Sequence, residues 1–150
     1  MSKDWDYYRC RLGNDPASIY VDLGIAAEAP ISTHPHLVCI SVPMLRAQAD
    51  GMSSQEEFDD LIALEDGLTA RLHGENAIYI GRNTSRGYRV FYYYCAEPEF
   101  FTLAAKAAMQ RHPTYRYDIG TRTDADWSTY FDFLYPSPAD YQRIQNRRLN

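Results

Sequence analysis

The sequence lacks the features that mark membrane, fibrous and disulfide-rich proteins. Its 150 residues hold no apolar run near the roughly 18 residues that a membrane span requires. Eight Gly and eight Pro are too few for a collagen-like or low-complexity chain. The three cysteines include no C-x-x-C pair, which is typical of a reducing compartment rather than of a disulfide framework. Residues 1–6 are polar and acidic, unlike a signal peptide, so we expect a cytoplasmic protein with no membrane partner.

Positive charge is in the minority, and lysine is nearly absent. The chain carries 15 basic and 20 acidic residues, a net charge of −5, which argues against a general nucleic-acid-binding protein. Residues 1–75 hold 5 of the basic and 13 of the acidic groups, so the acidic excess lies in the first half. All but two of the basic residues are Arg, which favours stacked and bidentate contacts. With 45% apolar residues, we expect a single globular domain over residues 1–150.

Patterning predicts a strand-rich beginning and a helical end. Residues 5–12 and 17–23 flank turn-forming residues 13–16, and they predict a β-hairpin over 5–23 that is closed by a loop rather than by a two-residue turn. Two helical segments form a predicted C-terminal extension over 124–149, the second with Ser137 as its N-cap and Pro138 at its first position.

The middle of the chain, residues 36–119, predicts the order strand, helix, strand, strand, helix, strand. Strands are expected at 36–42, 77–81, 88–95 and 115–119, and the second helix at 97–112. The first helix follows a capping box in which Ser53 and Glu56 satisfy opposing backbone N–H groups, and it ends at Gly74. This order predicts an α+β, ferredoxin-like (split βαβ) antiparallel sheet with both helices on one face.

Glu65 is the most unusual single residue. At helical spacing it falls among Leu61, Leu68 and Leu72, inside the apolar stripe of the first helix. A buried carboxylate must be paired or protonated, so we expect a donor from the sheet: Arg82, Arg89 or a Tyr hydroxyl, with Arg82 or a Tyr of the hairpin favoured. The sequence leaves two interpretations open: a structural ion pair or hydrogen bond, and an acid or base with a raised pKa.

No other residue pattern completes a catalytic or metal site. His34 and His36 resemble half a metal site, but zinc needs three or four ligands. The cysteines are isolated, and no phosphate-binding, dinucleotide-binding or nucleophile-elbow motif is present. We therefore expect no metal and no cofactor.

Residues 86–93 invite comparison with an RNA-recognition motif, which carries a basic residue, a Gly and stacking aromatics on its third strand. Arg86, Gly87 and Tyr88 match that pattern, but Arg89 and Val90 depart from it. The first predicted strand also lacks a second stacking aromatic. Cross-strand packing of a Tyr-rich strand explains the same residues, so RNA binding is kept only as a third alternative.

Several short motifs together resemble a bacterial family known only as domain of unknown function 695, over residues 5–136. They are residues 4–8 (DWDYY), 18–23 (SIYVDL), 64–66 (LED), 79–84 (YIGRNT), 87–94 (GYRVFYYY) and 126–130 (DWSTY). That family has a more remote likeness to the regulator of ribonuclease activity B, an α+β protein that inhibits ribonuclease E by binding it. The resemblance implies a binding function and offers no catalytic residues to carry over.

We therefore predict a non-enzymatic protein-interaction or regulatory domain with an unidentified protein partner, one form of which is a ribonuclease-regulator-like inhibitor. The alternative is a small-molecule enzyme of the hydrolase class that uses a buried Glu65 with Arg or Tyr partners. A basic helix end, with Arg143, Arg147 and Arg148, is either solvated or docks an acidic partner or RNA. The candidate binding residues are Glu65, Arg82, Arg89, Tyr93, Trp127 and Tyr130.

Overall fold

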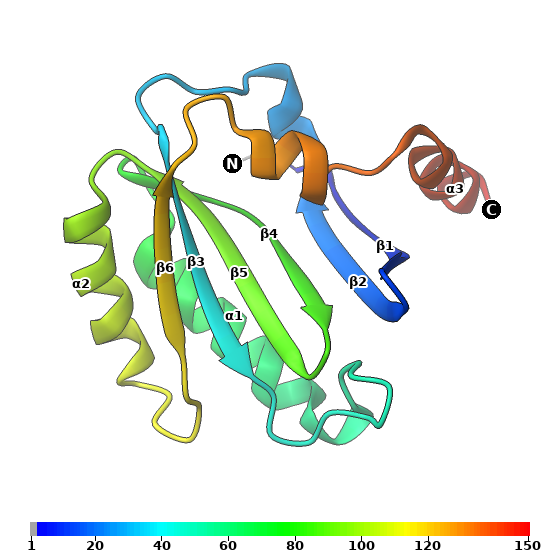
Figure 1. The fold of residues 1–150 in the computed structure, drawn as a ribbon, viewed down its shortest axis with the longest axis horizontal. Coiled ribbons are helices and arrows are strands. Elements are labelled where there is room, and N and C mark those ends of the chain that lie inside the picture. The colour runs from blue at the N-terminus through cyan, green and yellow to red at the C-terminus, as the bar shows by residue number, and fades with distance from the viewer. Residues whose placement is uncertain (1–2) are drawn as a thin grey trace.

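The computed structural model describes residues 3–150, and a six-stranded antiparallel sheet is its central feature (Figure 1). The strands are β1 (Trp5–Leu12), β2 (Asp15–Asp22), β3 (His36–Pro43), β4 (Ala77–Ser85), β5 (Tyr88–Cys95) and β6 (Asp118–Thr123). The helices are α1 (Phe58–Leu72), α2 (Pro98–Met109) and α3 (Pro138–Leu149), with short 3₁₀ or π turns η1 (Gly24–Ala27), η2 (Gln55–Glu57) and η3 (Tyr130–Leu134).

The strand order is β1-β2-β4-β5-β3-β6, and every neighbouring pair is antiparallel. Strand β5 lies between β3 and β4, which α1 joins, and β3 lies between β5 and β6, which α2 joins. The N-terminal hairpin extends the sheet through the pairing of β2 with β4. The predicted α+β class with an antiparallel sheet is therefore confirmed.

One hydrophobic core lies between the sheet and helices α1 and α2. Alternate residues of the central strands, such as Val38, Phe91 and Tyr93, face these helices and are buried. In α1 the buried positions recur at helical spacing, and they are Leu61, Leu64, Glu65, Leu68 and Leu72. The stripe is rotated slightly from the expected one, since Phe58 at its start is 53% exposed.

A second core fills the opposite face of the sheet, under the segment that follows β6. The indole of Trp127 is fully buried, stacks on Tyr94 at 4.0 Å between ring centroids, and donates its N–H to the carbonyl of His34 at 2.9 Å. Tyr130 is also fully buried, and its hydroxyl donates to the carbonyl of Asp22 at 2.6 Å. Residues 124–135 therefore cover one end of this face as an integral part of the fold (Figure 1).

The Asp124 carboxylate starts the segment that covers this second face. It accepts hydrogen bonds from the Tyr94 hydroxyl at 2.7 Å and from the backbone N–H groups of Ser128 and Thr129, each at 3.0 Å. Burial acts to raise the pKa of Asp124, but these hydrogen bonds outweigh it and hold the pKa well below its ordinary value. The ionised carboxylate thus takes the role of a helix N-cap.

Several expected boundaries are wrong. The first hairpin closes with a two-residue turn, Gly13–Asn14, because Gly13 adopts the left-handed region (φ 65°) that such a turn requires. The helix predicted from residue 124 is only a short π-helical turn from Tyr130. The last strand of the sheet is β6, three residues later than predicted, because Tyr115 instead points its hydroxyl at Glu57.

The predicted capping box is also wrong, and the neighbouring acid Glu57 binds the loop before the helix instead of capping it. Ser54 precedes η2 without a side-chain hydrogen bond, and Gly74 does not take a left-handed conformation after α1. The fully buried Glu57 carboxylate instead accepts from the backbone N–H groups of Leu45 and Arg46 at 2.9 and 2.7 Å. Glu57 therefore anchors the loop between β3 and α1. By contrast, Ser137 caps α3 as predicted.

Within residues 3–150, none of the helices combines the length and the apolar character that crossing a membrane demands.

We predict that replacing Asp124 with Asn destabilises the protein in a pH-dependent way. At pH 7 the free energy of unfolding should fall by about 2 kcal/mol, because a neutral amide accepts these hydrogen bonds poorly. The folded-state pKa is depressed, so this contribution is complete above the unfolded pKa of about 4 and is lost as the pH falls towards the folded value. Urea denaturation of both proteins should show the difference shrinking below pH 4. The exposed Asp126→Asn change serves as the control, and a difference independent of pH would contradict the assignment.

Candidate functional site

Glu65 lies where the sequence predicts a paired carboxylate. It is 7% exposed on the sheet-facing side of α1, and the Tyr79 hydroxyl donates to its Oε2 at 2.8 Å. Its other oxygen, Oε1, forms an ion pair with the Arg82 guanidinium. The contact predicted from helix periodicity is therefore confirmed with both kinds of donor, an arginine and a tyrosine from the β4–β5 hairpin.

The reason for this contact differs from the expected one. Strict alternation along β4 would place Arg82 on the face of Ile78 and Ile80, and these two residues would pack under α1. In the structure Ile80 packs in the opposite core, and Tyr79 lies under the helix. A β-bulge between Tyr79 and Gly81 inserts one residue, so Arg82 returns to the α1 face.

Glycine is required at this bulge. A Cβ on Gly81 would lie 2.8 Å from the carbonyl oxygen of Tyr20 on the neighbouring strand β2. The close approach of the two backbones at this position therefore leaves no room for a side chain. The motif around residue 81 thus has a structural explanation, which is to turn one arginine towards a buried acid.

A groove opens beside this ion pair, between α1 and the strands β1 and β2. It has a volume of about 400 Å³, and its lining comprises Trp5, Tyr20, Glu65, Asp66, Thr69, Ala70 and Tyr79. Three aromatic rings form a contiguous set, with Trp5 at 4.9 Å from Tyr20 and 5.3 Å from Tyr79 between centroids. The helix side contributes the carboxylates of Glu65 and Asp66. Aromatic rings and acids therefore meet in one shallow depression.

Arg82 links the buried pair to the groove. Its guanidinium lies over the Tyr20 ring at 4.6 Å from the centroid while it binds Glu65. The arginine side chain is 20% exposed, and it contacts the Tyr20 ring while its charge is paired with Glu65. The ion pair and the cation–π contact thus hold the aromatic lining in one arrangement.

Arg89 lies nearby on β5 but does not reach the groove. It is buried, and it donates to the Thr84 hydroxyl at 2.9 Å and to the Ser53 hydroxyl at 3.5 Å. Burial, together with the positive charge of Arg82, lowers the pKa of Arg89 to about 10. Arg89 therefore ties the loop before η2 to the sheet.

The remaining predicted binding residues lie in the two cores. Tyr93 is fully buried under α1, near Thr69, and its hydroxyl has no well-formed hydrogen bond. Trp127 and Tyr130 belong to the opposite face of the sheet. The structure thus brings Glu65, Arg82 and Arg89 together on the α1 side of the sheet. Trp127 and Tyr130 lie on the other side. A binding role for these buried aromatic residues stays a prediction.

Sequence reasoning missed Trp5 and Tyr20, the two rings that give the groove its character. Alternation along residues 17–23 places Tyr20 on the face opposite Ile19 and Val21. The signal was therefore present in the pattern, but its meaning depended on the order β1-β2-β4, which leaves this part of the sheet uncovered beside α1.

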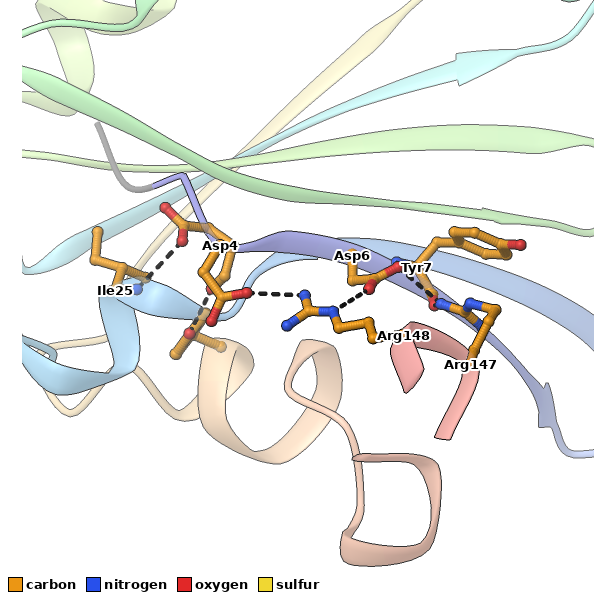
Figure 2. Close-up of polar contacts among 8 residues, drawn as sticks. Asp4, Asp6, Tyr7, Ile25, Arg147 and Arg148 are labelled. Atoms are coloured by element: carbon orange, nitrogen blue, oxygen red, sulfur yellow. Dashed lines mark hydrogen bonds and ion pairs between the residues drawn. The ribbon is translucent and has the colours of Figure 1, made fainter. Parts of the chain in front are cut away.

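The basic end of α3 binds the chain's own first strand (Figure 2). Arg148 bridges Asp4 and Asp6, with each nitrogen–oxygen distance at 2.8 Å. Arg147 pairs with Asp6 at 2.7 Å, donates to the Tyr7 carbonyl at 2.6 Å, and lies over the Tyr7 ring. Arg143 pairs instead with an aspartate within α3. The acidic docking partner considered for this helix end is thus an acidic strand of the same molecule.

Among residues 3–150, no group of three or more His, Cys, Asp or Glu side chains is arranged to hold a metal ion. The imidazole of His34 has hydrogen-bonding partners at both nitrogens, the Thr33 hydroxyl at 2.8 Å and the Glu75 carbonyl at 2.7 Å. Cys10, Cys39 and Cys95 are free thiols, and burial raises the pKa of each.

We predict that Glu65→Ala lowers the free energy of unfolding by about 3 kcal/mol, because it leaves Arg82 charged and unpaired in a largely buried position. Adding Arg82→Ala should recover part of this loss, and a double-mutant cycle by chemical denaturation measures the coupling. Asp66→Ala, one residue away on the exposed side of α1, is the matched control and should change stability by at most about 0.5 kcal/mol. Additive single changes would show that the pair contributes no coupling.

Comparison with known proteins gives one family and no closer relative. The model of a family of unknown function (DUF695) matches residues 3–135, which is most of the chain. No curated protein and no solved structure matches the chain. The fold and the groove described above therefore stand on the structure itself, and the chain belongs to the DUF695 family of unknown function.

Proposed function

We propose that this protein is a non-enzymatic interaction domain that binds a positively charged segment of another protein in the groove between α1 and the β1–β2 hairpin. The observation that carries the proposal is the meeting of Trp5, Tyr20 and Tyr79 with the carboxylates of Glu65 and Asp66 in one depression. Aromatic faces attract a Lys or Arg side chain, and the exposed Asp66 carboxylate adds charge complementarity, since the charge of Glu65 is already paired with Arg82.

The groove has the character of a binding surface held in advance. Tyr79 is buried and hydrogen-bonded to Glu65, and Tyr20 is supported by Arg82. Rigid aromatic anchors lose little conformational entropy on binding, which favours their use as contact residues. Asp66 is exposed at the rim, where its charge acts mainly on the encounter with a basic partner.

The enzymatic alternative depends on Glu65, and the contacts of that residue favour the structural role. Both carboxylate oxygens accept from protein donors, one from Tyr79 and one from Arg82. A general acid or base needs an oxygen directed at a substrate proton, and here each oxygen is directed at a neighbouring side chain. The groove therefore supports binding better than hydrolysis.

RNA binding through the Tyr-rich strand has less support. Stacking requires open aromatic faces. Tyr88 is 48% exposed, but Tyr92 is 7% exposed and Tyr94 is fully buried under the segment after β6, so Tyr88 has no open ring beside it on this face of β5. Arg86 and Gly87, the basic-Gly pair of the motif, form the β4–β5 turn with φ values of 54° and 83°.

A finer form of the proposal is an inhibitor that acts by binding a ribonuclease, as the remote likeness to the regulator of ribonuclease activity B implies. The groove would then receive a basic segment of the enzyme. This version shares the contact surface of the general proposal and adds only the identity of the partner.

Trp5 gives a direct test, because it lines the groove whereas Trp127 is fully buried. Titration with a nine-residue peptide of alternating Gly and Arg should shift the Trp5 fluorescence and protect it from iodide quenching. Asp66→Lys should weaken binding by about tenfold, since it replaces an attraction with a repulsion at the rim. Binding should also weaken as the salt concentration rises.

Three controls define the result. A Gly–Glu peptide of the same length should give no response, and Trp5→Phe should abolish the signal. Glu99→Lys, an equal charge reversal at the exposed start of α2, should leave the peptide affinity unchanged. Equal weakening by Glu99→Lys and Asp66→Lys would show attraction to net charge alone and would contradict the groove as the binding site.

A further inference from the structure

The two edges of the sheet differ in how their backbone groups are satisfied. At the β1 edge, the N–H of Tyr7 donates to the Asp6 carboxylate at 2.8 Å, and its carbonyl accepts from Arg147 of α3 at 2.6 Å. These side chains take the place of a neighbouring strand (Figure 2). Strand β6 is the opposite edge, and no further strand lies beyond it (Figure 1). An unpaired edge of this kind is a template for another strand.

Hydrogen bonding beside β6 shows which of its backbone groups face outwards. The N–H of Asp124 donates to the carbonyl of Pro35, just past the last pair of β3 and β6. Antiparallel strands alternate, so the groups of even-numbered β6 residues face β3, and those of Ile119, Thr121 and Thr123 face outwards. In the part of the chain that the structure describes, no hydrogen bond reaches these outward groups. They form a row of free donors and acceptors.

We propose that two copies of this protein associate through β6, antiparallel about a two-fold axis at Gly120, to form one continuous sheet. Ile119 of one copy then lies opposite Thr121 of the other, and both residues have backbone N–H and C=O groups that face outwards. These two residues can therefore exchange backbone hydrogen bonds, and the two-fold axis repeats the pair on its other side. Gly120 faces its own counterpart at the centre, where the absence of side chains permits close approach. This inference concerns a surface separate from the groove and goes beyond the proposed function.

Charge selects this register. With Gly120 at the axis, Asp118 of each copy lies opposite Arg122 of the other, and both side chains project from the same face of β6. An axis at Thr121 would instead place Asp118 opposite Asp124, and an axis at Ile119 would place Arg116 opposite Arg122. A register that pairs odd-numbered with even-numbered residues is excluded as well. It would place the outward backbone N–H and C=O groups of one copy opposite residues of the other copy whose backbone groups point towards β3. Only the Gly120 register is self-complementary in both backbone and charge.

The neighbouring helix extends the same surface. Leu103 on α2 is 68% exposed and shares a hollow with Thr121 of β6. Phe100, one turn earlier, is 63% exposed. A two-fold axis beside β6 brings the second copy towards Leu103, so association would cover apolar surface that the monomer leaves in water, whereas Phe100 lines a hollow on the α1 side of the helix. The Asp118 carboxylate makes no hydrogen bond or ion pair within the described residues, which leaves it available for the partner.

Sedimentation equilibrium of the full chain tests the proposal. The wild-type protein should have twice the 17.3 kDa mass of one chain. Asp118→Arg should raise the dimer dissociation constant at least about tenfold, because it faces Arg122 with a like charge at two symmetry-related positions. Adding Arg122→Asp to this variant restores opposite charges in exchanged positions and should recover the dimer. Glu28→Arg, the same charge change on an exposed loop away from β6, should leave the mass unchanged.

Circular dichroism checks that each variant is folded, so that loss of the dimer is distinguished from loss of structure. Asp118→Asn, which removes the charge without reversing it, is the milder second variant. A monomeric wild-type protein at concentrations of about 100 μM would overturn the proposal, since that range exceeds what a stable interface requires. A dimer that Asp118→Arg does not weaken would overturn it too, because the interface would then lie elsewhere. So would a folded double variant that stays monomeric.

Discussion

The burial of strand β5 on both faces is the constraint on which the rest of the molecule depends. Phe91 and Tyr93 pack beneath α1 and α2, while Tyr92 and Tyr94 pack beneath residues 124–135. A ferredoxin-like sheet with one open face could present its central strands to a ligand, but here the protein's own segment covers the part of the second face where Tyr92 and Tyr94 lie. The sheet is left open beside the β1–β2 hairpin, where the groove lies, and at the edge strand β6.

The Glu65 cluster marks the boundary between core and margin. Its carboxylate is buried deeply enough to need Tyr79 and Arg82, and Arg82 in turn reaches the ring of Tyr20 outside the core. Removing one charge of the Glu65–Arg82 pair would leave the other buried without a partner. Such a change lowers the free energy of unfolding even though the pair itself adds little net stability. A buried pair of this type is better understood as a device that specifies one arrangement of hairpin and helix than as a source of stability or as catalytic machinery.

The sequence predicted the α+β class and the pairing of Glu65, because both follow from periodicity within single elements. It failed where the outcome depended on contacts between distant segments. The bulge at Ile80 shifts the alternation along β4, so that Arg82 lies on the α1 face, and no pattern in the local sequence predicts this bulge. The helix start moved because Glu57, rather than Glu56, is held by the loop at Leu45 and by Tyr115. Trp5 and Tyr20 became a site only when the strand order placed them beside α1.

The two edges of the sheet are completed by different parts of the chain. Strand β6 lies within residues 3–135, the part that the family model matches, whereas α3 (Pro138–Leu149) lies beyond it. The cover over β1, which α3 supplies through Arg147 and Arg148, is thus carried by a segment outside the matched region. Its docking rests on one fully buried side chain, Ile144, and on ion pairs with the acidic first strand. The outward backbone groups of β1 are therefore occupied at Tyr7 while α3 is docked, whereas no hydrogen bond within the described residues reaches the outward backbone groups of β6, and this difference favours β6 for intermolecular strand pairing.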